Sequence, residues 1–207
     1  MREIKIPISP DTIRELHTGD TVALTGILAT GRDAVHKWMI DTFIRGTRDP
    51  EGDDLEVYEA IKPILKESLI YHCGPVVSGL EDKNYQFVAA GPTTSIREEP
   101  YQSEVMHHFD LRGVIGKGGM GAKTLQACQE VPACYFHAVG GAATLIAESV
   151  HQVLDVYKLG FGVPEAIWIL DVKEFPVVVT MDSHGVSVHD QVEQKSNTKF
   201  QQLLNPE

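Results

Sequence analysis

Apolar and polar positions along the chain alternate between the period of a strand and the period of a helix. Residues 21–30, TVALTGILAT, are rich in β-branched and aliphatic side chains, which favours a strand. In the segment that follows, apolar residues recur every four positions, at Val35, Met39 and Phe43. Asp33 precedes them and can cap the helix that this spacing predicts. This order of strand and then helix returns further along the chain and indicates a mixed α/β fold.

The same rules predict the other elements. Further strands are predicted at residues 3–8, 69–77, 85–91, 111–119 and 133–141, and further helices at 9–20, 55–68, 97–109, 122–131 and 142–161. Near the end the pattern changes, and the strands predicted there are 166–175, 176–181 and 186–190, with a turn at 182–185. The expected fold class is α/β, with a mixed sheet and an antiparallel C-terminal portion.

No repeat or linker divides this pattern, so residues 1–207 are expected to form a single domain, with 192–207 as a peripheral or frayed tail. A chain of 207 residues with 43% hydrophobic and 23% charged residues can bury a sizeable core. Its formal charge of -11 opposes binding to nucleic acid or to an anionic membrane surface, because both need a basic face. Any anionic ligand must therefore be held by a local group of cations.

The N-terminal segment lacks the apolar core of a signal peptide, and no apolar run approaches the roughly 20 residues of a membrane span. The three cysteines, Cys73, Cys128 and Cys134, form no C-x-x-C pair, which indicates buried, unreactive thiols in a reducing compartment. A cytoplasmic location is therefore expected. The histidines offer no H-x-H or H-x-x-x-H pair, so no metal site is predicted within this chain.

Three times a predicted strand ends in a short loop of glycine, threonine or proline that carries a cation and leads into a helix. These loops are residues 30–33, 91–97 and 116–121. Loops at strand ends are where α/β proteins commonly build ligand sites, and the start of a helix offers free N–H groups to an anion. We expect the three loops to meet at one site.

Arg32, Arg97 and Lys117 bring three positive charges to these loops. Such a set suits a small ligand with more than one carboxylate, because arginine pairs a carboxylate through two parallel hydrogen bonds. Thr93 and Thr94 add hydroxyl groups that can bind a ligand or relay a proton. Each feature also has an ordinary structural interpretation, since an arginine can pair with a surface carboxylate and a threonine can cap a helix.

The loop at 116–121 also suggests a different class of function, a phosphate- or nucleotide-binding module. A phosphate-binding loop has the form G-x-x-x-x-G-K-[ST], and Gly116 and Gly121 have the required spacing. Ala122 then precedes Lys123 and Thr124, which rotates both side chains by about 100° on the first helical turn. The sequence makes this the weaker interpretation. A third alternative is a non-catalytic domain that only completes the fold of another subunit.

Four ordered segments, TGRDAVH, GPTTSIR, VIGKGGMG and LDVKEFPVVVTMDSHG, resemble the β subunit or C-terminal domain of the iron–sulfur class I hydro-lyases, the family of class I fumarate hydratase and L(+)-tartrate dehydratase. The resemblance implies a swivelling β/β/α domain that closes on a separate α subunit. It also implies that the α subunit carries a [4Fe-4S] cluster, with none on this chain, and that two α and two β subunits form a heterotetramer. The implied reaction is the reversible hydration of fumarate to (S)-malate, with L(+)-tartrate dehydration as the close alternative, and the chain is expected to be inactive alone.

The resemblance also assigns roles to individual residues. The residues that it implies for binding the dicarboxylate substrate are Arg32, Thr94, Arg97 and Lys117. Thr93 is implied to accept the proton at the carbon next to the departing hydroxyl, aided by a group outside this chain. The glycines that support the loop are Gly116, Gly118 and Gly119.

Two features depart from the family pattern. Val186 follows the DSHG segment, where asparagine is expected, and the acidic loop at 44–54 is longer than expected. The first puts the usual contact of that turn in question. The second is expected to alter the interface with the partner.

Overall fold

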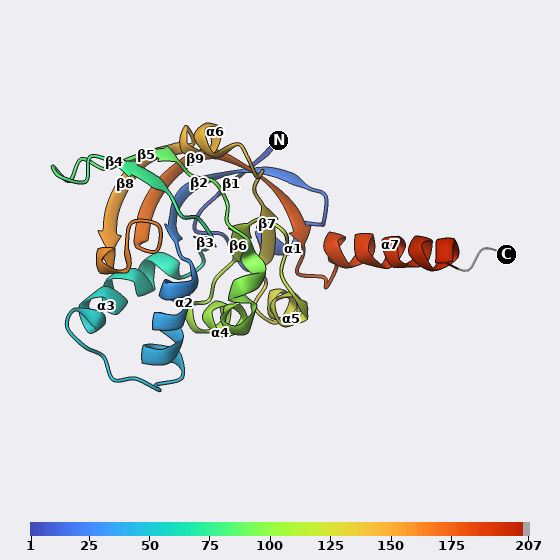
Figure 1. Ribbon diagram of the computed structural model, residues 1–207, viewed down its shortest axis with the longest axis horizontal. Helices are drawn as coiled ribbons and strands as arrows, with labels where there is room; N and C mark the ends of the chain where they lie inside the picture. Colours follow the sequence, from blue (N-terminus) through green and yellow to red (C-terminus); the bar gives the residue numbers. More distant parts are fainter. Residues whose placement is uncertain (205–207) are drawn as a thin grey trace.

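The computed structural model describes residues 1–204. Within them, seven strands form one sheet in the order β1-β2-β3-β6-β7-β9-β8 (Figure 1). These strands are β1 Arg2–Lys5, β2 Thr21–Thr30, β3 Leu69–Tyr71, β6 Gly113–Gly116, β7 Cys134–His137, β8 Val150–Tyr157 and β9 Ile167–Met181.

The sheet is mixed, and the long strand β9 closes it. Strands β1, β2, β3, β6 and β7 are parallel neighbours, whereas β9 runs antiparallel to β2, β7 and β8. Because β9 pairs with both β2 and β7, the strands β2, β3, β6, β7 and β9 form a closed ring. The predicted mixed α/β class, with its antiparallel C-terminal portion, is confirmed.

Alternate side chains of the ring strands enter two different hydrophobic cores. In β3, Leu69 and Tyr71 belong to the core inside the curved sheet, whereas Ile70 belongs to the core beneath the helices. In β7, Phe136 and Tyr135 divide in the same way. Since both faces of these strands are buried, they appear in the sequence as short, almost continuous apolar runs.

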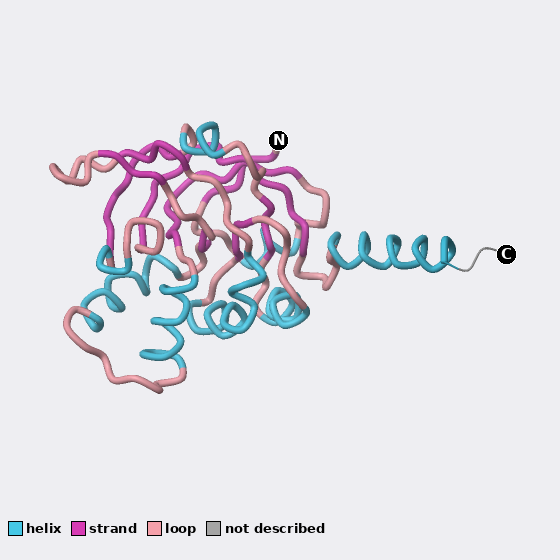
Figure 2. Tube along the Cα trace, in the orientation of Figure 1, coloured by secondary structure: helices cyan, strands magenta, loops and turns pink. Residues whose placement is uncertain are grey.

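Four helices lie together against one face of the sheet, where Figure 2 shows helix and strand as separate layers. They are α2 Asp33–Met39, α3 Asp54–Leu65, α4 Glu99–Phe109 and α5 Ala122–Glu130. On the opposite side lie the short helix α6, Ala143–Ala147, and the hairpin of β4, Val76–Ser78, and β5, Gln86–Ala89. Helix α1, Pro10–Arg14, begins at the Ser9 cap and buries Ile13 in the inner core. The helices and strands predicted before residue 142 are present, and most of them are shorter than predicted.

The long helix predicted at 142–161 is wrong. Only α6 is helical there, and it is followed by β8 and by the short 3₁₀ helix η3, Leu159–Phe161. Strand β8 pairs with β9, with register shifts between Val150 and Gln152 and between Val153 and Asp155. Each irregularity adds a residue to the strand, so apolar residues that face the core recur every three positions and imitate a helix.

The strand predicted at 186–190 is also wrong. Ser187 makes one isolated bridge to Met181, and helix α7, Val188–Leu204, then begins. The Ser187 hydroxyl accepts a hydrogen bond from the Asp190 N–H, so it caps this helix. Helix α7 extends away from the rest of the molecule and buries none of its described side chains (Figure 1). None of the helices in residues 1–204 is long and apolar enough to cross a membrane.

Candidate active site

The carboxyl ends of β2, β3 and β6 lie next to one another, because these strands are parallel neighbours. Arg32 follows β2, His72 follows β3 and Lys117 follows β6. Backbone hydrogen bonds continue beyond the strands, from Gly31 N–H to the Tyr71 carbonyl at 3.0 Å and from His72 N–H to the Ile115 carbonyl at 2.8 Å. The loops that carry the predicted site residues are thus fastened to each other where they leave the sheet.

Thr93, Thr94 and Lys117 are brought together directly. The Lys117 N–H donates to the Thr93 carbonyl and the Ser95 N–H donates to the Lys117 carbonyl, both at 3.2 Å, so Thr94 and Lys117 form a parallel bridge. The Thr93 N–H and hydroxyl both donate to the His72 carbonyl, at 2.7 and 3.1 Å. Thr94 makes no capping hydrogen bond through its side chain. Its exposed hydroxyl is available to a ligand.

Arg97 follows this bridge by three residues, Arg32 lies on the neighbouring loop after β2, and each arginine contacts a carboxylate of the chain. Arg97, in the 3₁₀ helix η2, Ser95–Glu98, places Nη2 3.4 Å from Oδ2 of Asp33. Arg32 places Nη1 3.1 Å from Oε1 of Glu165. Within residues 1–204, Lys117 has no ion-pair partner. The lysine is therefore the site cation most directly available to an incoming anion.

The glycines of the 116–119 loop have identifiable steric roles. A Cβ on Gly116 would lie 1.9 Å from the Ser95 Oγ, so a larger residue would push η2 away from the loop. Gly119 has φ of +76°, and a Cβ there would lie 2.3 Å from the ring of His189 in α7. Gly118 also has positive φ, at +80°. These contacts support the predicted role of the glycines as loop supports.

The prediction that free helix N-termini face a ligand is wrong for α5, and at α2 one of the N–H groups is already bonded. The Glu99 carboxylate accepts hydrogen bonds from the N–H groups of Gly121, Lys123 and Thr124 and from the Thr124 hydroxyl. At α2, the Glu165 carboxylate accepts from the Ala34 N–H. Glu99 thus occupies the position at α5 that a phosphate would take, which weighs further against a nucleotide-binding loop.

Sequence reasoning missed Glu98, a carboxyl group at the base of the site. Its side chain is buried, and within residues 1–204 its oxygens have no hydrogen-bond partner other than the neighbouring Asp33 carboxylate. Burial, followed by the neighbouring Asp33 carboxylate, raises the pKa of Glu98 to about 8, although Arg97 acts in the opposite sense. Glu98 is therefore protonated at neutral pH. No local motif marks it, because its environment comes from α2, which precedes it by more than 50 residues.

Replacing Glu98 with glutamine is expected to flatten the pH dependence of folding stability. The wild-type carboxyl binds its proton more tightly when folded, so stability is greatest below its ordinary pKa of 4.5 and is lost as the pH rises towards about 8. The loss approaches about 1.4 kcal/mol per pH unit in that window. Urea unfolding should therefore show Glu98→Gln more stable than wild type at pH 9, with a smaller difference at pH 5. The exposed Glu59→Gln is the control, and equal pH profiles for all three proteins would contradict the assignment.

The cysteines of this chain do not fit an iron–sulfur cluster. All three are free and buried, as predicted. Burial raises the pKa of the Cys73 and Cys128 thiols to about 12 and holds the pKa of Cys134 well above its ordinary value. Cluster ligands are thiolates, so these protonated thiols are unsuited to that task. Among residues 1–204, no group of three histidine, cysteine or acidic side chains is placed to hold a metal ion.

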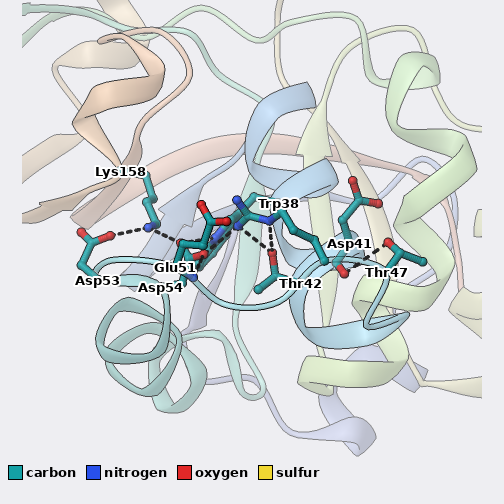
Figure 3. Close-up of polar contacts among 9 residues, drawn as sticks. Trp38, Asp41, Thr42, Thr47, Glu51, Asp53, Asp54 and Lys158 are labelled. Atoms are coloured by element: carbon teal, nitrogen blue, oxygen red, sulfur yellow. Dashed lines mark hydrogen bonds and ion pairs between the residues drawn. The ribbon is translucent and has the colours of Figure 1, made fainter.

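The acidic loop at 44–54 is held by a group of polar contacts around Asp54, which Figure 3 shows. Asp54 is buried and accepts hydrogen bonds from the Trp38 Nε1 at 2.8 Å, the Arg48 Nη2 at 2.7 Å and the Glu51 N–H at 2.9 Å. Lys158 pairs with both Asp53 and Asp54. These bonds join the loop, α2 and the segment after β8. The other departure from the family pattern, Val186, closes the 182–185 turn. Its carbonyl accepts from the Asp182 N–H and its N–H donates to the Asp182 carboxylate, both at 3.0 Å.

A family model described as Fumarase C-terminus matches residues 2–192. A Geobacillus stearothermophilus protein provisionally named fumarate hydratase class I is 47% identical over 203 residues, which cover 98% of this chain and 36% of that protein. The L(+)-tartrate dehydratase subunit beta of Escherichia coli strain K12 is 34% identical over 180 residues, covering 86% of this chain and 82% of that subunit.

A Methanocaldococcus jannaschii protein provisionally named L(+)-tartrate dehydratase subunit beta is 36% identical over 194 residues, which cover 93% of this chain and 93% of that protein. The chain therefore spans 36% of the length of the fumarate hydratase relative and most of the length of the two beta subunits. The family match includes every predicted site residue. It shows that this chain belongs to the Fumarase C-terminus family.

Proposed function

We propose that this chain is the β subunit of an iron–sulfur hydro-lyase that reversibly hydrates fumarate to (S)-malate. The proposal is carried by the meeting of Thr93, Thr94 and Lys117 at a β-bridge beside Arg97, in a chain of the Fumarase C-terminus family. Relatives named as beta subunits imply an α partner, proposed to form a heterotetramer of two α and two β subunits. A [4Fe-4S] cluster, with its Lewis acidity, is proposed to belong to that partner.

In this proposal the cations of the chain bind and orient the substrate carboxylates. Lys117 needs no rearrangement, because it has no competing ion pair within residues 1–204. The Arg97–Asp33 pair is about half exposed on both sides, and such surface pairs contribute only about 0–1 kcal/mol. A substrate carboxylate can therefore displace Asp33 at little cost. Arg32 is held more firmly, by Glu165 and by the Pro164 carbonyl. It would bind a substrate carboxylate without leaving its present position.

Thr93 is proposed to receive the proton from the carbon beside the departing hydroxyl group. Its own proton is directed to the His72 carbonyl, which leaves oxygen lone pairs available. A threonine hydroxyl is a weak base, so a basic group of the partner must take the proton onward. Negative charge then accumulates on the neighbouring carboxylate. Fixed cations stabilise that charge more in the transition state than in the bound substrate.

L(+)-tartrate is the second candidate substrate. Two relatives named as tartrate dehydratase beta subunits resemble this chain over most of their length, whereas the fumarate hydratase relative has the higher identity but is much longer. Malate and L(+)-tartrate both carry two carboxylates and lose water across a carbon–carbon bond. The cationic site accommodates either one.

Anaerobic co-expression with a cluster-bearing partner is expected to yield an enzyme that interconverts fumarate and malate. The purified complex should be assayed with malate, fumarate and both tartrate enantiomers, with this chain alone as the control. Activity on L(+)-tartrate alone would favour the second candidate. Appreciable hydration by the isolated chain would contradict the shared site, and binding of ATP in a calorimetric titration would revive the nucleotide-binding alternative.

A further inference from the structure

A line of buried polar side chains runs beneath the loops of the candidate site. Each of its members is 0% exposed. They come from α2, the end of β3, η2, α4 and β7. In spatial order they are His36, Gln102, His72, Ser95 and Tyr135. Five fully buried polar groups are costly unless they bond to each other, so their arrangement requires an explanation.

Gln102 lies at the centre of this line. As the amide is placed, its Oε1 lies 3.0 Å from the Nε2 of His36 and 2.9 Å from the Nε2 of His72. Within residues 1–204 the amide nitrogen is buried and has no hydrogen-bond partner. Beyond the histidines, the His36 Nδ1 lies 3.0 Å from the Arg32 carbonyl and the His72 Nδ1 lies 2.8 Å from the Ser95 Oγ. The Tyr135 hydroxyl donates to the same Ser95 oxygen at 2.9 Å.

Hydrogen-bond chemistry decides which atoms of this line donate. The Arg32 carbonyl can only accept, so the His36 Nδ1 must carry a proton. Burial lowers the pKa of both His36 and His72, so each ring is neutral and has a single N–H. The His36 Nε2 is therefore an acceptor and needs a donor, which an amide oxygen cannot provide. The oxygen and nitrogen of an amide are assigned by such bonds, and here the nitrogen belongs between the rings.

The line also reaches every loop of the candidate site. His36 bonds to the Arg32 carbonyl, and the backbone carbonyl of His72 accepts both hydrogen bonds of Thr93. The backbone N–H of Ser95 donates to the Lys117 carbonyl. One side chain from α4 thus connects the loops after β2, β3 and β6. A change at Gln102 would be felt at all three.

We propose that Gln102 is a positioning residue for the reaction, its amide nitrogen donating one hydrogen bond to the Nε2 of each of two neutral histidines and so fixing the loops of Arg32, Thr93 and Lys117 relative to one another. The kinetic part of this proposal rests on the proposed hydro-lyase function. The proposed proton positions and the coupling between the loops do not depend on that function.

Histidine tautomers test the amide orientation without any turnover. Nitrogen NMR of the full chain labelled at histidine is expected to show His36 and His72 protonated on Nδ1 and unprotonated on Nε2 at neutral pH. The isosteric Gln102→Glu loses donors between the rings, because an ionised carboxylate has only acceptors and a protonated one has a single O–H. The signal of at least one histidine should therefore change to an Nε2-protonated or doubly protonated form. If the wild-type protein carries a proton on the Nε2 of either His36 or His72, the proposal is overturned.

Backbone amide resonances test the coupling of the loops. In Gln102→Glu, the N–H signals of residues 31–33, 93–95 and 117–119 are expected to shift together. The matched control is Val105→Ala, which truncates an apolar side chain buried on the same helix and outside the polar line. Shifts confined to α4 in Gln102→Glu would overturn the proposal.

In the assembled enzyme, Gln102→Glu is expected to lower kcat about 100-fold, with a smaller change in KM, because a misplacement of about 1 Å costs that much in the reacting step. Val105→Ala should retain the kcat of wild type per folded enzyme. Wild-type kcat in Gln102→Glu would overturn the positioning role. A wild-type complex without hydro-lyase activity would instead defeat the proposed function, while the NMR measurements would still decide the proton arrangement.

Discussion

Replacing Lys117 with alanine is expected to lower kcat of the assembled enzyme by about 100- to 1,000-fold, the usual effect of removing one group that stabilises transition-state charge. Within residues 1–204 the Lys117 ammonium group has no ion-pair partner, and its backbone is held by Thr93 and Ser95. Its loss should therefore leave the fold intact. Arg97→Ala is expected to act in the same direction. Steady-state kinetics and the unfolding midpoint should be measured on the same preparations.

Lys123→Ala is the matched control for this experiment. Lys123 lies six residues further on, is exposed, and contributes its backbone N–H to the Glu99 cap. We expect turnover within about twofold of wild type. Near-normal turnover in both Lys117→Ala and Arg97→Ala would defeat the proposed dicarboxylate site.

Replacing Asp54 with asparagine is expected to destabilise the fold by about 3–5 kcal/mol, the usual cost of removing one partner from a buried ion pair. The side chain of Asp54 is 5% exposed and that of Lys158 is 9% exposed. Of the lysine's ion pairs with Asp53 and Asp54, the substitution would leave the one with the exposed Asp53. Urea unfolding at pH 7 should show the loss. In the matched control Asp53→Asn, which removes the exposed partner, a change below about 1 kcal/mol is expected.

The pH dependence supplies a second check on Asp54. Burial opposes its ionisation, but hydrogen bonds from Lys158, the Glu51 N–H and Trp38 together lower the pKa of Asp54 to about 2. A carboxyl with a lowered pKa contributes its stability above its ordinary value of 3.8 and loses it as the pH falls towards 2. The difference between wild type and Asp54→Asn should therefore narrow below pH 4. An unchanged difference at pH 2.5 would contradict this account.

The sequence predicted the parts of the fold that local patterns control. β2 and α2 have the expected positions because the period of apolar residues changes sharply at Gly31. β8 escaped prediction, since its bulges place Val150, Val153 and Val156 at a three-residue spacing that only the pairing with β9 explains. The ring closure between β2 and β9 joins residues about 150 apart and leaves no local mark.

In the candidate site, too, features set by local sequence could be predicted and features set by distant contacts could not. The positions of Arg32, Thr93, Thr94 and Lys117 after strands could be predicted, because each follows a recognisable strand and belongs to a short motif. Their functional roles are still predictions. Glu98 and Gln102 could not be predicted, since their importance comes from burial against α2 and β3.

Closure of the ring by β9 has a consequence for synthesis of the chain on the ribosome. Residues 21–29 pair with residues 169–178, so the second edge of β2 is left open until almost the whole domain has emerged. Open strand edges template association with other chains, and distant pairings are slow to form. Nascent chains stalled before residue 167 should therefore depend on chaperones and aggregate when released, whereas chains released after residue 181 can close the ring of strands.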